Sequence, residues 1–304
     1  MRKTFLMSNF YSDFLVQIIS INNVIRSKNL VTKLTDFGIE YKIPPEVIPD
    51  VGDFQAGLLH SASLTRLISQ RTIMINEIGC ALAHRVAMIN FLKSDHKFGI
   101  FFEDDAEIIA DFNFDTLSQL LDSETPIIVT LGWIPGFAIS KNLQIIPSEE
   151  LIELITAPTC TFAYAMNRPA ARLMIDSHEK IIDLPDWPIY TLNRVKFYAP
   201  RWPWVMANHD PKLSTIGVRS TPLSKSPIGI LKFRIRLVTY LITLVFLSKI
   251  NKLDASPKQI LHQLLIRGSL HRYGVGQVAE NSATSEVIPL PLKFQKILSF
   301  LKLS

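Results

Sequence analysis

Apolar and polar positions alternate with two different periods along the first part of the chain. Residues 15–21, which are mostly apolar, predict a first strand, and residues 27–37 predict a helix. Residues 38–43 predict a second strand, and residues 44–62 carry no period and predict a loop. A strand, a helix and a second strand in this order are the expected opening of an α/β domain.

The next predicted unit is a long helix followed by a strand. Apolar residues at helical spacing predict one apolar helix face, made of Ile78, Leu82, Val86, Ile89 and Leu92. Asn76 is a typical N-cap residue, and Glu77 falls in the first turn, where the helix dipole favours an anion. Residues 98–102 then predict a buried, aromatic-rich strand, and residues 127–133 predict a later one.

Three consecutive acids, Glu103, Asp104 and Asp105, follow the strand at 98–102. Adjacent carboxylates repel one another, so they need either solvent or a hard cation among them. Mg²⁺ and Mn²⁺ prefer such oxygen ligands and often bridge to substrate phosphates. Open α/β sheets also bind ligands at the carboxyl ends of their strands. The triplet therefore indicates a metal–nucleotide site, and a solvated acidic turn is the alternative.

Residues 77–84 read E-I-G-C-A-L-A-H, and residues 102–106 read F-E-D-D-A. These two segments resemble the E-I-G-C-x-x-S-H and L-E-D-D-A patterns of glycosyltransferase family 25, which contains bacterial lipooligosaccharide galactosyltransferases. Three later segments are also similar: Y-A-M-N-R-P-A-A-R-L at 164–173, D-L-P-D-W-P at 183–188 and P-K-L-S-T-I at 211–216. Two positions depart from the pattern: Ala83 replaces a serine, and S-I-N-N-V at 20–24 replaces I-N-L-D-R.

The resemblance implies a GT-A-type, Rossmann-like glycosyltransferase domain at residues 1–221. It further implies an inverting, metal-dependent enzyme that moves a hexose to a lipooligosaccharide or related surface glycan. The expected sugar is galactose, with UDP-galactose as its donor. A transferase of the same fold that uses UDP-glucose or UDP-N-acetylhexosamine is one alternative. A catalytically silent, membrane-peripheral glycan-binding or assembly protein is another, and a metal-dependent phosphohydrolase is a third.

The acids receive separate roles under this interpretation. Alternate residues of an extended chain point to one side. We therefore expect Asp105 to bind Mn²⁺ or Mg²⁺ directly and Glu103 to reach the metal or the ribose. Asp104 would face the other way or toward the donor sugar, as a catalytic carboxylate. His209 is a further candidate metal ligand by analogy with such folds, and a surface loop histidine is its bland alternative.

Inversion requires a base on the face opposite the leaving group. Asp186 matches the family's Pro-x-Asp position and lies beside Trp187, which could stack on a sugar ring. Asp183 and Asp210 remain competing bases, and a turn residue before Pro188 is the structural alternative for Asp186.

Three further groups complete the candidate site. The resemblance favours a site role for His84, either at the diphosphate or in orienting the acidic loop. It also places Asn22 where the family contacts the nucleoside. Arg201, Trp202 and Trp204 form an aromatic and basic loop that fits either an acceptor groove or core packing.

Composition narrows the protein class. The chain has 304 residues, 48% of them hydrophobic and 19% charged, which is enough for a sizeable core. Its two cysteines, Cys80 and Cys160, exclude a disulfide framework and a zinc site made of cysteine alone. A buried helix cysteine is favoured for Cys80, with a nucleophile as the sharper alternative. Residues 1–14 lack the continuous apolar stretch of a secretory signal, so we expect a cytoplasmic protein.

The charge is concentrated at one end of the chain. Residues 222–304 hold 12 Lys and Arg against 3 Asp and Glu, net +9, whereas residues 1–221 hold 20 against 24, net −4. Lys232, Arg234 and Arg236 precede an uncharged run at 237–248 that is too short to span a bilayer. We therefore expect a basic, partly helical extension that lies on an anionic membrane surface, at the inner face of the cytoplasmic membrane. A packed helical cap is the alternative, and the chain carries no nucleic-acid-binding motif.

Overall fold

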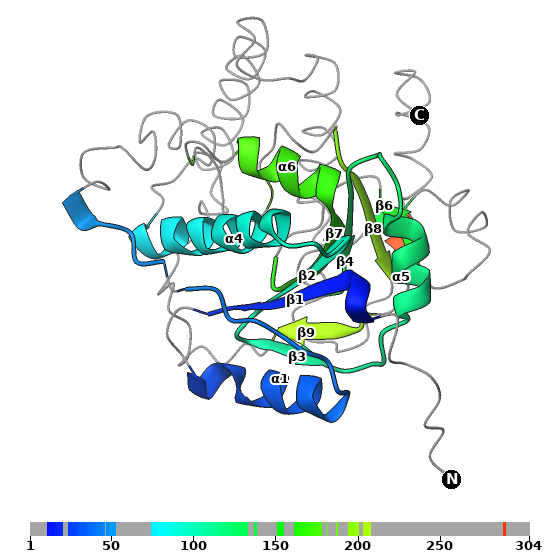
Figure 1. Cartoon of the computed structure of the whole chain (residues 1–304), viewed down its shortest axis with the longest axis horizontal. Coiled ribbons are helices and arrows are strands. Elements are labelled where there is room, and N and C mark those ends of the chain that lie inside the picture. Colours follow the sequence, from blue (N-terminus) through cyan, green and yellow to red (C-terminus); the bar gives the residue numbers. More distant parts are fainter. Residues whose placement is uncertain are drawn as a thin grey trace, which may run out of the picture.

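The computed structural model of the chain describes residues 11–20, 24–45, 47–52, 74–132, 137–138, 151–154, 161–177, 181, 187, 194–200, 203–207 and 288–289. Its centre is a six-stranded sheet with helices on both faces (Figure 1). The strands are, in spatial order, β1 (Phe14–Ile19), β2 (Phe98–Glu103), β7 (Ala163–Asn167), β4 (Ile127–Thr130), β8 (Lys196–Pro200) and β6 (Leu151–Leu154). β1 is parallel to β2 and β4 is parallel to β8, while β7 and β6 run antiparallel to their neighbours. The expectation of an α/β fold is therefore confirmed, with a mixed sheet.

Alternating side chains divide the core between the two faces of the sheet. Leu15 and Ile19 of β1 pack on the face covered by α4 (Ile75–Lys93) and α6 (Arg168–Ser177). Phe14 and Val16 pack on the opposite face, with α1 (Val24–Asp36) and α5 (Phe114–Leu121). Figure 1 shows α4 and α6 side by side above the sheet and α1 below it. Strands covered on both faces read as largely apolar segments, as β1 and β2 do in the sequence.

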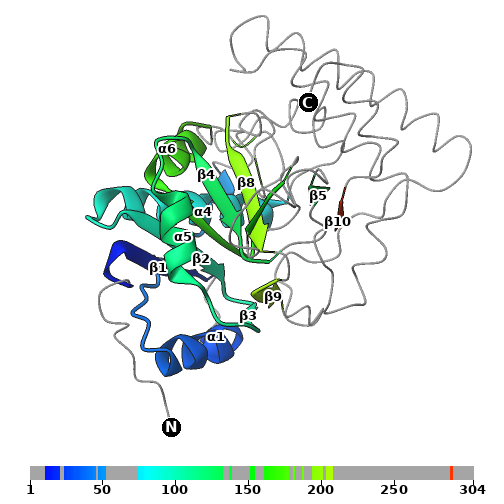
Figure 2. The ribbon, with the colours of Figure 1, turned by 90° about the vertical axis from the view of Figure 1, so that its right-hand side faces the viewer.

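Two short strand pairs flank the main sheet (Figure 2). β3 (Ala106–Ile108) is antiparallel to β9 (Val205–Ala207), and β5 (Phe137–Ala138) is parallel to β10 (Ile288–Pro289). A short 3₁₀ helix, η1 (Tyr11–Asp13), leads into β1. β10 belongs to the basic segment 222–304, whose other residues lie outside the described part of the chain. None of the described helices combines the length and the hydropathy that crossing a bilayer requires.

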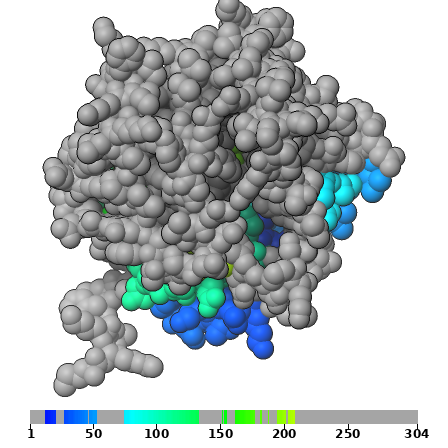
Figure 3. All heavy atoms as spheres, turned by 180° about the vertical axis from the view of Figure 1, so that it is seen from behind, coloured from blue at the N-terminus to red at the C-terminus, as the bar shows by residue number. Residues whose placement is uncertain are grey.

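The surface seen from behind includes parts of two of these helices. Figure 3 shows the blue residues of α1 along the lower edge and the cyan residues at the start of α4 toward the right. Four of the five large apolar side chains that are exposed among the described residues come from the stretch that follows α1: Phe37, Ile43, Ile48 and Val51.

The expected strand at 38–43 is replaced by the end of α1 and a single bridge. Gly38 has a φ of 66°, and its N–H donates to the Thr35 carbonyl while the Ile39 N–H donates to the Leu34 carbonyl. Glycine adopts this left-handed conformation without strain and so ends the helix. Only Lys42 then reaches β1, where it forms an isolated parallel bridge with Gln17. The sequence pattern mistook a helix C-terminus for the start of a strand.

Candidate active site

The carboxyl end of β2 carries the first of the three acids. β2 ends at Glu103, opposite Ile19 of β1, and the chain turns at Asp104 and Asp105 into β3. Phe101 lies in the core layer beneath α4 and α6. Side chains alternate along a strand, so Glu103 is directed to the same layer as Phe101. The acid therefore faces α4.

α4 presents a polar pair to that acid. Its buried side contains Cys80 and His84, one turn apart, followed by Ala87, Met88 and Phe91. The predicted apolar face is only partly correct: Ile78 is buried, but Leu82, Val86, Ile89 and Leu92 are half-buried. The small residues Ala83 and Ala87 sit in the core layer against the sheet, which places the bulky aliphatic residues on the flanks of the helix.

The helix start also differs from the expectation. α4 begins at Ile75 after Met74, so Asn76 lies inside the first turn and is not the N-cap. Glu77, which is 1% exposed, accepts a hydrogen bond from the Met74 N–H at 3.0 Å. This carboxylate satisfies a backbone donor at the helix start, as in a capping box, and anchors the turn that precedes Cys80.

His84 joins two strands through its two ring nitrogens. Its Nδ1 lies 2.9 Å from the Tyr164 hydroxyl on β7, and its Nε2 lies 3.2 Å from Glu103 Oε1 on β2. The Thr161 hydroxyl, just before β7, donates to the same Glu103 oxygen at 2.8 Å. A phenol that donates to Nδ1 leaves the Nε2–H to donate to the carboxylate, so this tautomer satisfies every member. Tyr164, His84, Glu103 and Thr161 thus form one hydrogen-bonded chain.

The phenol of Tyr164 is held in its neutral form. Burial raises the pKa of Tyr164 well above its ordinary value, and the nearby Glu103 and Cys80 raise it further. The ring also stacks on Phe101 and meets Trp187 edge to face. The hydroxyl therefore remains a donor at every pH near neutrality, and its position is fixed by packing.

The other two acids are placed differently from Glu103. Asp104 is 4% exposed and accepts a hydrogen bond from the Ser20 hydroxyl at 3.1 Å, at the end of β1. Asp105 is half-buried in the turn. Because the chain turns here, the alternation that was expected to align Glu103 with Asp105 does not extend beyond Glu103. Ser20 was missed as a site residue, although parallel neighbours ending at one sheet edge are a usable signal for it.

One group of potential metal ligands is gathered in the described part of the chain. In Cys80, His84 and Glu103, the sulfur, a ring nitrogen and a carboxylate oxygen all lie within 4.8 Å of one another. Such a mixed set suits a softer ion, and it was not expected from the sequence. The i, i+4 spacing of Cys80 and His84 was the available signal. The carboxylates of the triplet, the oxygen donors that Mg²⁺ or Mn²⁺ prefers, are not gathered in this way, because Asp104 is directed to Ser20 and Glu103 to His84.

Several predicted site residues lie outside the described part of the chain: Asn22, Asp183, Asp186, Arg201, Trp202, His209 and Asp210. Trp187 is described, and its predicted sugar-stacking role is wrong. The indole is 2% exposed and packs edge to face on Tyr164 and Phe197 within the core. Trp204 is buried against Phe112, which favours core packing over an acceptor groove for that residue.

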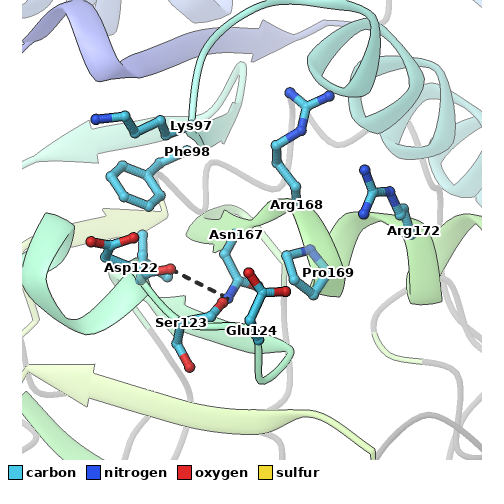
Figure 4. Close-up of a pocket in the computed structure, with 10 residues that line it drawn as sticks. Lys97, Phe98, Asp122, Ser123, Glu124, Asn167, Arg168, Pro169 and Arg172 are labelled. Atoms are coloured by element: carbon cyan, nitrogen blue, oxygen red, sulfur yellow. Dashed lines mark hydrogen bonds between the residues drawn. The ribbon is translucent and has the colours of Figure 1, made fainter.

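A pocket of about 410 Å³ opens at the other end of strand β2, away from Glu103 (Figure 4). It lies at Phe98, the first residue of β2, about 17 Å along the strand from Glu103. Asn167, on its wall, donates to the carbonyls of Leu121, Ser123 and Thr125 and accepts from the N–H groups of Ile127 and Ala170. The polar groups of Asn167 thus hold the α5–β4 connection and the start of α6, which gives this wall a structural role.

No family model matches the chain, and no curated protein matches it. Among solved structures, the chain is similar to A197 from STIV, with 15% identity, 64% of this chain and 84% of that chain covered, and a TM-score of 0.33. It is also similar to a glycosyltransferase involved in the glycosylation of the major capsid of PBCV-1. That likeness has 9% identity, covers 54% of this chain and 65% of that chain, and has a TM-score of 0.28. Likenesses this distant do not assign a function.

Proposed function

We propose that this chain is a metal-dependent, inverting glycosyltransferase of family 25 with a GT-A-type fold. It moves a hexose from a UDP-sugar to the glycan of a lipooligosaccharide or related surface polysaccharide. Galactose is the leading candidate for the sugar. The supporting observation is the contact of His84 with both Glu103 and Tyr164, which lie 19 and 80 residues away in the sequence. These residues come from the three described motifs that carry the resemblance. They meet at the carboxyl end of strand β2, and α/β sheets bind ligands at the carboxyl ends of their strands.

The proposed roles follow the chemistry of the donor. Departure of a nucleoside diphosphate requires neutralisation of the negative charge that develops on it, which Mn²⁺ or Mg²⁺ supplies as a Lewis acid. Asp105, Glu103 and His209 would hold the ion, and Asn22 would contact the nucleoside. His84 fixes the orientation of Glu103 through its Nε2. Asp104 would face the donor sugar, and Asp186 would accept the proton of the attacking acceptor hydroxyl.

The test is a transfer assay with the full-length protein. Radiolabelled UDP-galactose, UDP-glucose and UDP-N-acetylhexosamines are offered with Mn²⁺ or Mg²⁺ and a purified glycolipid acceptor, and both transfer and donor hydrolysis are measured. We expect transfer of one sugar, which stops when the metal is chelated. Asp105→Asn is expected to abolish transfer without changing the circular dichroism. Glu107→Gln removes one charge from an exposed residue of the neighbouring strand β3 and serves as the matched control.

Each other outcome identifies an alternative. Transfer of glucose or an N-acetylhexosamine keeps the enzyme class and changes the donor. Cleavage of phosphate esters without an acceptor indicates a phosphohydrolase, and donor binding without turnover indicates a silent glycan-assembly protein. Full activity of Asp105→Asn in Mn²⁺ would remove the metal assignment.

A further inference from the structure

We propose that Cys80, His84 and Glu103 bind one thiophilic divalent ion of the Zn²⁺ class, and that this ion takes Glu103 away from the donor-binding metal. The binding site itself is independent of the proposed function, whereas the inhibition that follows rests on it. The three side chains are contributed by one turn of α4 and the end of β2.

The distances suit a tetrahedral ion. Zn²⁺ binds nitrogen and carboxylate oxygen at about 2.0–2.2 Å and sulfur at about 2.3 Å, so its nitrogen and oxygen ligands stand about 3.3 Å apart. His84 Nε2 and Glu103 Oε1 are 3.2 Å apart, and the sulfur of Cys80 lies within 4.8 Å of both donor atoms. Small side-chain adjustments would therefore bring three ligands onto one ion. Three protein ligands leave the fourth position to water.

The outer contacts are those that orient metal ligands. The Tyr164 hydroxyl lies on His84 Nδ1, which directs Nε2 toward the site, and the Thr161 hydroxyl holds Glu103 Oε1. The Glu103 side chain is 25% exposed, so solvent has a route to the site, while the His84 side chain is only 4% exposed. With an ion on Nε2, the imidazole proton moves to Nδ1 and is donated to the Tyr164 oxygen.

Ligand chemistry explains the choice of ion. A thiolate and an imidazole select borderline-soft metals over Mg²⁺, which prefers oxygen. Binding replaces the thiol S–H bond of Cys80 with a sulfur–metal bond, and the released proton passes to the buffer. Because Glu103 is also a proposed ligand of the donor-binding metal, an ion bound by Cys80, His84 and Glu103 would remove one oxygen ligand from that metal. Zinc-class ions are therefore expected to inhibit transfer.

The binding test uses Co²⁺ as a spectroscopic probe and Zn²⁺ as a competitor on the chelator-treated, full-length protein. We expect a thiolate-to-cobalt charge-transfer absorption that saturates at one ion per chain and disappears when Zn²⁺ is added. Cys80→Ser should lose this band, whereas Cys160→Ser, which removes the other cysteine, should keep it. Removal of the outer partner in Tyr164→Phe should weaken the affinity about 10-fold. Glu107→Gln, on the exposed side of the neighbouring strand β3, should keep the band like the wild type.

The outcomes separate the site from the enzyme activity. A Co²⁺-loaded wild-type protein without a thiolate band overturns the proposal whether or not any variant folds. So does a band that survives in Cys80→Ser and is lost in Cys160→Ser. In the transfer assay, Zn²⁺ should inhibit the wild type and Cys160→Ser at concentrations about 100-fold below those that inhibit Cys80→Ser. A protein that shows the cobalt band but transfers no sugar keeps the site and refutes the proposed function.

Discussion

At the residue scale, the neutral phenol of Tyr164 links the site to stability. Its folded-state pKa is raised, so the native protein retains a proton that the unfolded chain loses at about pH 10. The stabilisation is fully present below that pH and is lost as the pH rises toward the folded-state pKa. Tyr198 shifts in the same direction: burial, then the charge of Glu153 and a hydrogen bond to it, raises its pKa to about 12.

We therefore predict that Tyr164→Phe flattens the alkaline part of the stability curve. Near neutral pH the variant should be destabilised by about 1–3 kcal/mol, because His84 Nδ1 loses its buried partner. Between about pH 9 and 11.5, its free energy of unfolding in urea should fall less than that of the wild type. Tyr198→Phe should also flatten the curve and leaves His84 untouched. Parallel curves for wild type and Tyr164→Phe would contradict the assignment.

The proposed base is tested by two neighbouring carboxylates. Asp186→Asn is expected to lower the chemical step by roughly 10²–10⁴-fold while UDP and metal binding survive. Asp183→Asn makes the same change three residues earlier in the same segment and should leave turnover near that of the wild type. Single-turnover transfer and equilibrium UDP binding distinguish the roles. If Asp183→Asn carries the loss, the base assignment moves to that residue, and loss of UDP binding alone indicates a donor-side role.

The candidate site was only partly predictable from single residues. The triplet at the strand end and His84 stand in motifs, so the sequence identified them. Ser20 and Thr161 stand in no motif of their own. The signal for Ser20 is its place at the end of a predicted parallel strand, and the contacts of both residues form only when strand ends meet in the finished sheet. Trp187 misled the prediction for a related reason: an indole beside a candidate base looks available to a sugar until packing places it in the core.

At the element scale, Arg168 ties the end of α4 to the start of α6. Its guanidinium donates to the carbonyls of Leu92, Ser94 and His96 at 2.6 Å, 3.0 Å and 3.0 Å, and lies over the Phe91 ring. Figure 4 shows the Arg168 side chain directed toward the end of α4. The last carbonyls of a helix lack internal partners, and a cation there also suits the helix dipole.

Removal of this guanidinium is predicted to destabilise the fold. Arg168→Ala should lower the free energy of unfolding by about 1.5–3 kcal/mol, because three partly buried carbonyls lose a charged donor. Arg168→Lys should recover only part of it, since an ammonium lacks the planar fork. Arg172→Ala removes an exposed arginine one turn later in α6 and should change stability by less than about 0.5 kcal/mol. Urea unfolding of the three variants gives the comparison, and equal losses for Arg168→Ala and Arg172→Ala would exclude the capping role.

Element prediction succeeded where burial on both sides of the sheet dictates the pattern. β1 and β2 read as apolar runs because helices cover both of their faces. Prediction failed at the end of α1, where Gly38 ends a helix, and on α4, where apolar spacing alone does not identify the side that meets the sheet. Both failures concern tertiary contact, which a local period does not encode.

At the scale of the whole molecule, the main feature that neither the fold nor the candidate site explains is the uneven distribution of charge along the chain. The net +9 of residues 222–304 stands against −4 for the rest of the chain. One short strand of this segment, β10, pairs with β5, which shows that the segment returns to the part of the chain before residue 222 at that point. Strand pairing at 288–289 is compatible with either a packed cap or a membrane-binding surface elsewhere in the segment.

We predict that the basic segment holds the protein on an anionic membrane, where lipid-linked acceptors are assembled. Each Lys or Arg near such a surface contributes on the order of 1 kcal/mol, and salt screens the attraction. Binding to vesicles that contain anionic lipid should therefore fall as salt rises. It should fall further in the triple variant Lys232→Gln, Arg234→Gln and Arg236→Gln.

A matched triple variant, Lys28→Gln, Lys33→Gln and Lys42→Gln, removes the same charge from the first part of the chain and should bind like the wild type. Transfer to a short soluble acceptor should hardly change in either variant, because the acidic site lies more than a hundred residues before the basic cluster. Equal vesicle binding by the first triple variant and the wild type would instead identify the segment as a packed structural cap.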